Sequence, residues 1–318
     1  MANDSRLPRL SAGLLLAFIL VSAAFAADRK TYPMDIPAEG VRTISFDVQE
    51  GDFVLRGDPE ARAVQMRVSI DRFWVFKLGE EGILKRLIKI TGEGTDHLTI
   101  ATDIPRAISN WGRAQYPIDF EVVVPAGAKV ELRDASGIIS VSDMSADVSI
   151  TDGSGTLAAS RLQGALRVTK ESGDIRVDDV TGAVRIASQS GQLRLRNLGE
   201  LDIERSDGNI DLAQSRTAHL RSNGGNIRAN GVQGDLRIDD ESGEIVVTDV
   251  TGKVEIHDTS GQIRIARTGA VVIYDTSGDV TARETAGLRI VDKESGKVNA
   301  TDISGSVEVP ARITLQQK

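Results

Sequence analysis

A glycine, preceded in most cases by serine, recurs through the second half of the chain at an almost constant spacing. The interval between successive glycines is always 17 or 18 residues. The ten positions are Gly137, Gly155, Gly173, Gly191, Gly208, Gly225, Gly243, Gly261, Gly278 and Gly296. A fixed period of this length is typical of a chain built from stacked copies of one supersecondary unit.

Aliphatic residues hold fixed places relative to each repeat glycine. Isoleucine, leucine or valine stands two residues after each of the ten glycines and also five residues before each of them. For the last glycine, Gly296, these residues are Val298 and Val291. Seven residues before the glycine, only Arg289 breaks the apolar series. A further apolar site often follows seven residues after it. The residues between are mostly polar, and this alternation with a period of two predicts strands with one face turned inward.

These patterns predict an all-β fold, a β-solenoid of about ten coils of 17–18 residues with two short strands per coil. Glycine suits the corners because it adopts positive φ at no steric cost. A left-handed hexapeptide helix is disfavoured because the inward sites do not recur every six residues. A two-sheet sandwich is the remaining alternative, although it needs no constant repeat length. The handedness of the coil is left open.

The first 26 residues have the pattern of an export signal. Arg6 and Arg9 precede the apolar stretch 14–21, and Ala24-Phe25-Ala26 matches a small-x-small cleavage site. The apolar stretch is too short to span a bilayer comfortably. We therefore predict a signal peptide at 1–26 and an exported mature chain, either periplasmic or extracellular.

Residues 27–127 precede the repeat domain, which we place at 128–318. Polar and apolar residues alternate at 44–48, 64–70 and 118–124, so this region is expected to be rich in β-strands. We interpret it as an N-terminal cap that closes the first coil and shields its open edge.

One segment of this cap is a candidate contact surface. Phe73, Trp74 and Phe76 precede the segment 83–90, whose apolar residues and basic residues suit one amphipathic turn of helix. Such a segment could contact a membrane surface or a partner groove. The alternative, which we favour, is that it packs over the end of the solenoid as part of the cap.

The chain resembles a known family at the start of its repeats. The segment PIDFEVVVP at 117–125, then VEL at 130–132 and the first repeat glycine, is similar to the start of the DUF4097 family of adhesin-like proteins. Its serial SGxIxV and GxVxI units correspond to SGDIRV at 172–177 and GAVRI at 182–186. The resemblance covers nearly all of the mature chain except the more hydrophobic segment 73–90. It implies a β-strand-repeat solenoid in envelope or exported proteins, and no catalytic motif.

Catalytic, metal and cofactor sites are not indicated. The three histidines are isolated, and the repeated Ser-Gly pairs lack the G-x-S-x-G elbow of a nucleophile. Aspartates stand three residues before many repeat glycines, at Asp134, Asp152, Asp240, Asp258 and Asp275. Stacked carboxylates could bind Ca²⁺, but Lys170, Arg205 and Lys293 interrupt the column. We therefore expect solvated turn residues, no metal and no cofactor.

Arginines form the best candidate site for a ligand. Arg176, Arg194, Arg228 and Arg264 stand three residues after repeat glycines, in a column broken by Asp211. Guanidinium groups match carboxylates, so this outward column could hold an acidic polysaccharide. It could equally be a solubilising face. The net charge of −8 argues against a nucleic-acid partner.

We therefore expect an exported, envelope-associated structural or interaction module, not an enzyme. It would bind a polymer or an envelope protein through the solenoid face or the cap, with peripheral membrane contact as an option. A carbohydrate-active enzyme is one alternative, because long β-helices also host polysaccharide lyases and hydrolases. An envelope-stress or signalling accessory is another. The partner and the oligomeric state are left open.

Overall fold

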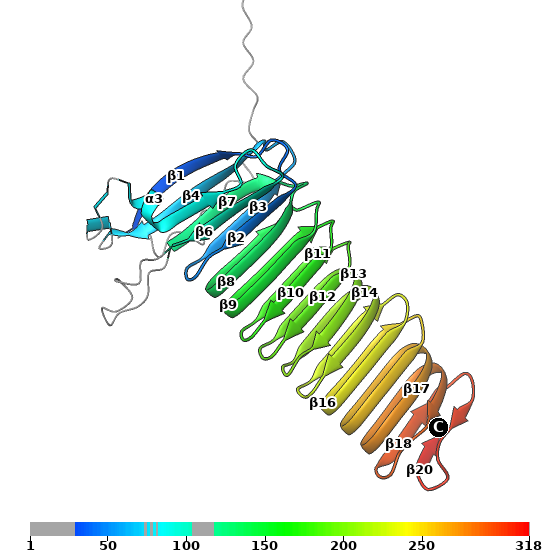
Figure 1. Cartoon of the computed structure of the whole chain (residues 1–318). Coiled ribbons are helices and arrows are strands. Elements are labelled where there is room, and N and C mark those ends of the chain that lie inside the picture. Colours follow the sequence, from blue (N-terminus) through cyan, green and yellow to red (C-terminus); the bar gives the residue numbers. More distant parts are fainter. Residues whose placement is uncertain (1–28, 73–74, 77–78, 81, 104–117, 318) are drawn as a thin grey trace, which may run out of the picture.

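The computed structural model describes residues 29–72, 75–76, 79–80, 82–103 and 118–317, and it is an elongated stack of β-coils (Figure 1). The N-terminal strands gather at one end of the stack and the C-terminal strands at the other. The predicted β-solenoid is confirmed. The export signal predicted at 1–26 lies outside the described residues.

Each coil pairs in parallel with the equivalent part of the next coil. On β11 (Ile175–Val180), Ile175 is in register with Leu157 of β9 (Val148–Leu162) and with Leu193 of β13 (Leu193–Arg205). Both partners are 18 residues away, which is the repeat given by the glycines. The other strands of this stack are β8 (Lys129–Ser142), β10 (Leu166–Lys170), β12 (Val184–Ser188), β14 (Ile210–Ser222), β15 (Ile227–Val232), β16 (Leu236–Val250), β17 (Val254–Ile290), β18 (Lys297–Thr301), β19 (Val307–Glu308) and β20 (Thr314–Gln317).

The aliphatic residues predicted to face inward form one continuous core along the stack. All ten residues that stand two positions after a repeat glycine are at most 1% exposed. The further apolar site is buried as well, as Val180 and Val250 show. Each coil therefore closes its lumen with branched side chains that stack on those of the coils above and below.

The last coil departs from the expected register. The repeat predicts that Val291 faces inward, but Val291 is partly exposed, and Leu288 and Ile290 are buried instead. A shift of one residue exchanges the two faces of a strand. Arg289 consequently points outward, where its Nε lies 3.5 Å from a carboxylate oxygen of Glu308.

Two features of the backbone explain the repeat glycines. Nine of the ten have φ between 94° and 150°, where other residues are strained. The coils also approach each other closely at this corner. A Cβ atom on Gly173 would lie 1.9 Å from the carbonyl oxygen of Gly155, and every repeat glycine has the same contact at 2.8 Å or less.

A second left-handed corner lies six residues after each repeat glycine. All ten residues at this place have positive φ, and nine of them are not glycine. Their side chains pair between coils. Arg161 makes two hydrogen bonds of 2.6 and 2.9 Å to Asp143, and Arg267 makes two of 2.7 and 2.8 Å to Asp249. These bidentate pairs offset strain of about 1–2 kcal/mol per residue.

The parallel stack begins before the repeat pattern. β2 (Thr43–Asp47) and β3 (Phe53–Asp58) pair in parallel with the two halves of β8. Gly51 between them has φ of 125°, and its carbonyl oxygen lies 1.9 Å from where a Cβ on Gly137 would be. Gly51 is therefore an additional repeat glycine. The region that the sequence predicts to be a cap thus contributes one coil to the stack.

Antiparallel strands cover the N-terminal end. β6 (His97–Thr102) and β7 (Ile118–Pro125) pair in parallel with the outer edges of β2 and β3. Beyond them, β4 (Ala63–Asp71) runs antiparallel to β7, and β1 (Arg29–Pro37) runs antiparallel to β4. On the other side, β5 (Ile88–Thr91) runs antiparallel to β6. The change of direction ends the parallel series, and these strands cover the edge of the first coil.

The segment expected to be an amphipathic turn of helix contains α3 (Ile83–Leu87). Ile83 and Leu87 are buried, and Lys85 and Arg86 are exposed. Phe76 is 83% exposed, whereas Phe73 and Trp74 lie outside the described residues. No helix among the described residues is both long and apolar enough to cross a membrane.

Candidate functional site

The predicted arginine column lies on the outward face of one row of strands. Arg176 is on β11, Arg194 on β13, Arg228 on β15 and Arg264 on β17, and all four are exposed. The strand register places the outward residues side by side in the order Arg176, Arg194, Asp211, Arg228, Val246 and Arg264. The column is therefore one continuous row across the stack.

Acidic neighbours occupy two ends of this row. The Nε atom of Arg176 lies 2.5 Å from a carboxylate oxygen of Asp178. Arg264 forms an ion pair with Glu244. Arg194, by contrast, has one side-chain partner in the described part of the chain, the amide oxygen of Gln192, to which it donates at 2.5 Å. The guanidinium charge in the middle of the row is therefore the least neutralised by neighbouring carboxylates.

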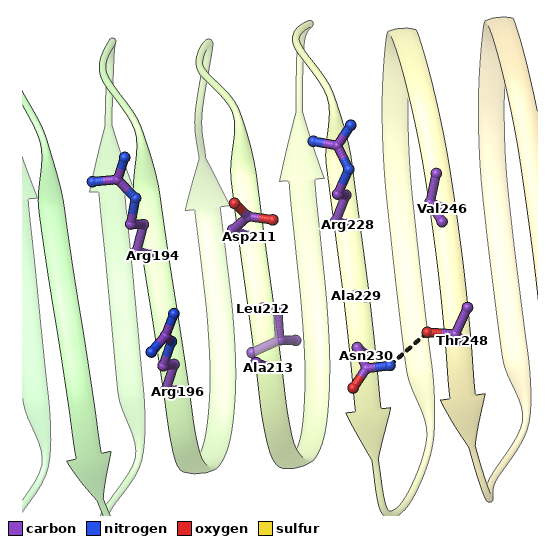
Figure 2. A pocket seen from close by; sticks show the side chains of 10 residues that line it. All are labelled: Arg194, Arg196, Asp211, Leu212, Ala213, Arg228, Ala229, Asn230, Val246 and Thr248. Carbon is purple, nitrogen blue, oxygen red and sulfur yellow. Dashed lines mark hydrogen bonds between the residues drawn. The ribbon is translucent and has the colours of Figure 1, made fainter.

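A hollow of about 420 Å³ lies over this middle part. Arg194 and Arg196 of β13 stand on one side of it and Arg228 of β15 on the other (Figure 2). The strand between them carries the short side chains Asp211 and Ala213, and this difference in length makes the depression. We call the hollow bounded by Arg194, Arg196 and Arg228 the arginine hollow.

The charge of the arginine hollow is positive. Three guanidinium groups face one carboxylate, that of Asp211. Within the described part of the chain, Arg194 and Arg196 have no carboxylate within 4.0 Å, and Arg228 reaches Glu244 only at 3.9 Å. Arg196 was not among the predicted residues. Its place five residues after the repeat glycine, on the same strand face as Arg194, was the available signal.

The prediction that the column of aspartates consists of solvated turn residues is wrong. Asp134, Asp152, Asp240, Asp258 and Asp275 are each 7% exposed or less. They point inward because they continue the alternation of the two aliphatic residues before them, and a strand turns every second side chain to the same face. The serines of the intermediate coils, Ser188, Ser206 and Ser222, are buried too.

Two buried lysines belong to the same column. Lys170 forms an ion pair with Asp152 of the preceding coil, and Lys293 forms one with Asp275. The side chains of both lysines are fully buried. Burial, reinforced by the charge of Asp152, raises the pKa of Asp134 to about 7. Burial also raises the pKa of Asp258 to about 7 and that of Asp240 to about 6.

The histidines lie on the outward faces of their strands, where His97 is exposed and His219 and His257 are partly buried. His97 is hydrogen-bonded to Ser45 (2.8 Å), His219 to Asp239 (2.6 Å), and the ring of His257 stacks on Tyr274 at 4.3 Å. Among the described residues, no group of three or more histidine, cysteine or acidic side chains is arranged to hold a metal ion.

Comparison with known proteins identifies the family of the chain. The Toastrack DUF4097 family matches residues 89–229 and again 181–318, so the two matches together span 89–318. No curated protein matches the chain.

Solved structures are similar only at a distance. A "putative lipid binding protein" from Parabacteroides distasonis is 15% identical, with coverage of 90% of this chain and 98% of its own and a TM-score of 0.39. A "putative adhesin" from Bacteroides fragilis is 13% identical, with coverage of 88% and 96% and a TM-score of 0.31. At these TM-scores the likeness carries no argument about binding, which rests on the residues described above.

Proposed function

The chain belongs to the Toastrack DUF4097 family, and from that premise we propose that it is an exported, adhesin-like binding module of the bacterial envelope rather than an enzyme. Its ligand is an acidic polymer, held in the arginine hollow. Export is supported by the signal pattern in residues 1–26. A long stack of coils offers an extended surface, which suits a partner that is itself extended.

The observation that carries this proposal is the uncompensated charge of Arg194 and Arg196. Arg176, on the same row of strands, is neutralised by Asp178. A guanidinium group binds a carboxylate through two parallel hydrogen bonds, which gives direction as well as charge. Two such groups on one strand, faced by Arg228 across the hollow, can hold successive carboxylates of one polymer.

A non-catalytic role is favoured by the shape of the site. The arginine hollow lies on a continuous sheet between coils of nearly constant length, and a polysaccharide-cleaving enzyme needs an acid and a base converging on one bond. Among the described residues, Asp211 is the one carboxylate that lines the arginine hollow. The arrangement is therefore suited to holding a polymer and not to cleaving it.

The experiment that tests the proposal measures binding to immobilised polygalacturonate, with neutral dextran as the reference polymer. The variant Arg194→Ser/Arg196→Ser/Arg228→Ser should lose more than about tenfold in affinity, because hydrogen bonds between charged groups contribute about 1.5–3 kcal/mol each. Binding by the parent should weaken as salt is added.

A matched triple variant on the other row of strands controls for net charge. Arg133→Ser/Arg167→Ser/Arg185→Ser removes the same charge from exposed positions of β8, β10 and β12. This variant should bind like the parent. Equal losses in the two variants, or equal binding of dextran and polygalacturonate, would show that the arginine hollow is not the site.

Exposed Phe76 supports a second candidate contact, at the N-terminal end. A phenylalanine that is 83% exposed, nine residues before the exposed Lys85 in the sequence, suits the surface of an anionic membrane. Phe76→Ser should then reduce sedimentation with phosphatidylglycerol vesicles while leaving the circular dichroism spectrum unchanged. Unchanged sedimentation would contradict this contact.

A further inference from the structure

The arginine column carries its cations on every second coil where it crosses the arginine hollow and beyond it. The strand register places Arg194, Asp211, Arg228, Val246 and Arg264 on successive coils, and Figure 2 shows this order from Arg194 to Val246. The three arginines are exposed, whereas the coils between them present a carboxylate and an aliphatic side chain. Cationic and non-cationic coils therefore alternate along the outer surface.

The spacing of these cations is fixed by the sheet. Neighbouring strands lie about 4.8 Å apart, so Arg194 and Arg228 project from strands that are about 9.6 Å apart. Arg228 and Arg264 are separated by the same number of strands. One sugar ring of an extended polysaccharide is about as long as one strand spacing. A polysaccharide that lies along the stack therefore places a sugar over each coil, and every second sugar meets an arginine.

The coil between Arg194 and Arg228 is suited to a neutral sugar. Among the described residues, no lysine or arginine nitrogen lies within 4.0 Å of the carboxylate of Asp211. This carboxylate repels an acidic sugar and accepts hydrogen bonds from the hydroxyl groups of a neutral one. The short side chain of Ala213, which also lines the hollow, leaves room for the ring.

We propose that the arginine hollow binds an acidic polysaccharide in which a uronic acid alternates with a neutral sugar, and that the polymer lies along the stack. This inference rests on the proposed function and adds the chemical repeat of the ligand and its direction. One uronate lies over β13, where Arg194 and Arg196 flank it. The neutral sugar lies over Asp211, and the next uronate lies against Arg228.

The row beyond the hollow offers a third, weaker contact for the same repeat. Arg264 is paired with Glu244, which also lies 3.9 Å from Arg228. Arg264 is exposed and Glu244 is partly exposed, and an ion pair that is open to solvent is weak. A uronate over Arg264 therefore competes with Glu244. The aliphatic side chain of Val246 lies between the second and third uronates, where it contacts the apolar face of a neutral sugar.

The test compares two oligosaccharide probes of equal length by titration calorimetry with the full chain at constant ionic strength. Hyaluronan oligosaccharides alternate glucuronate with neutral N-acetylglucosamine, whereas oligogalacturonates carry a carboxylate on every sugar. Attraction by charge alone favours the oligogalacturonate, which has twice as many carboxylates. We expect the hyaluronan probe to bind at least about fivefold more tightly, because the oligogalacturonate places a carboxylate against that of Asp211.

Three variants separate the repeat from the total charge. Asp211→Asn should strengthen oligogalacturonate binding about fivefold or more and change hyaluronan binding by less than about twofold, which removes the preference. Glu200→Gln, at an exposed position on the other half of β13, removes the same charge and should keep the preference. Arg264→Ser should weaken hyaluronan binding about threefold, because the third contact is lost.

The outcomes distinguish this inference from the function on which it rests. Tighter binding of oligogalacturonate than of hyaluronan, with both lost in Arg194→Ser/Arg196→Ser/Arg228→Ser, would overturn the alternating repeat and leave the proposed function standing. A preference for hyaluronan that persists in Asp211→Asn would overturn selection by the middle coil, and an unchanged affinity in Arg264→Ser would overturn the direction along the stack. Binding of neither probe, or binding that the triple variant does not affect, would overturn both proposals.

Discussion

The replacement Asp134→Asn should stabilise the protein at pH 8 and leave it unchanged at pH 4. Asp134 is 7% exposed, and its Oδ2 atom has no hydrogen-bond partner among the described residues. Its Oδ1 atom accepts a hydrogen bond from the backbone N–H of Ser136 at 3.3 Å. Asparagine keeps that acceptor and removes the charge, so the variant isolates the effect of burying a carboxylate.

The magnitude follows from the shift in pKa. Burial, with the nearby charge of Asp152, raises the pKa of Asp134 from 3.8 to about 7 in the folded protein. Between these two values the folded chain holds a proton that the unfolded chain has lost, so the stability falls as the pH rises. A shift of about three units corresponds to about 4 kcal/mol at full burial. We expect Asp134→Asn to recover about 2–4 kcal/mol above pH 7.

Urea unfolding followed by circular dichroism at pH 4 to 8 measures this difference. The free energy of unfolding of Asp134→Asn minus that of the parent should be near zero at pH 4 and should grow through the window from about 4 to 7. Asp47→Asn, at an exposed position of β2, is the control and should show no such trend. Destabilisation by Asp134→Asn at pH 8, or a gain of equal size at pH 4, would refute the reasoning.

The buried ion pair and the stacked glycines give two further predictions. Lys170→Met should lower the free energy of unfolding by about 3–5 kcal/mol at pH 8, because it leaves Asp152 buried and unpaired; Lys253→Met, on the surface, should change it by less than about 1 kcal/mol, and similar losses would argue against the buried pair. Gly173→Ala should destabilise by more than about 2 kcal/mol, because its Cβ would overlap a carbonyl oxygen at 1.9 Å. Gly127→Ala, with open space around it, should be nearly neutral in the same urea titration.

The repeat predicted the fold because it fixes two things at once, the corner and the inward face. It could not reveal the coil formed by β2 and β3. Gly51 and Gly137 are 86 residues apart in sequence although their coils are adjacent. The strands inserted between them lengthen the interval fivefold and remove the period on which the prediction depended. The shift at Ile290 was hidden for a related reason, since a one-residue slip leaves the apolar composition of the coil unchanged.

The sites were predicted less well than the fold. The arginine column was visible because outward residues obey the same period as the core, but Asp178 and Glu244, which neutralise its ends, belong to neighbouring positions and coils. The aspartate column was misinterpreted because aspartate near glycine is common in turns. Its spacing of two from the preceding aliphatic residue was the stronger signal, since it continues the strand.

The most direct test of the proposed function is the protection of individual arginines by the polymer. Phenylglyoxal modifies exposed arginines, and mass spectrometry can follow each one with and without polygalacturonate. We predict that the polymer protects Arg194, Arg196 and Arg228 and leaves Arg167 and Arg185 as reactive as before. Equal protection of all five arginines, or protection of none, would contradict binding in the arginine hollow.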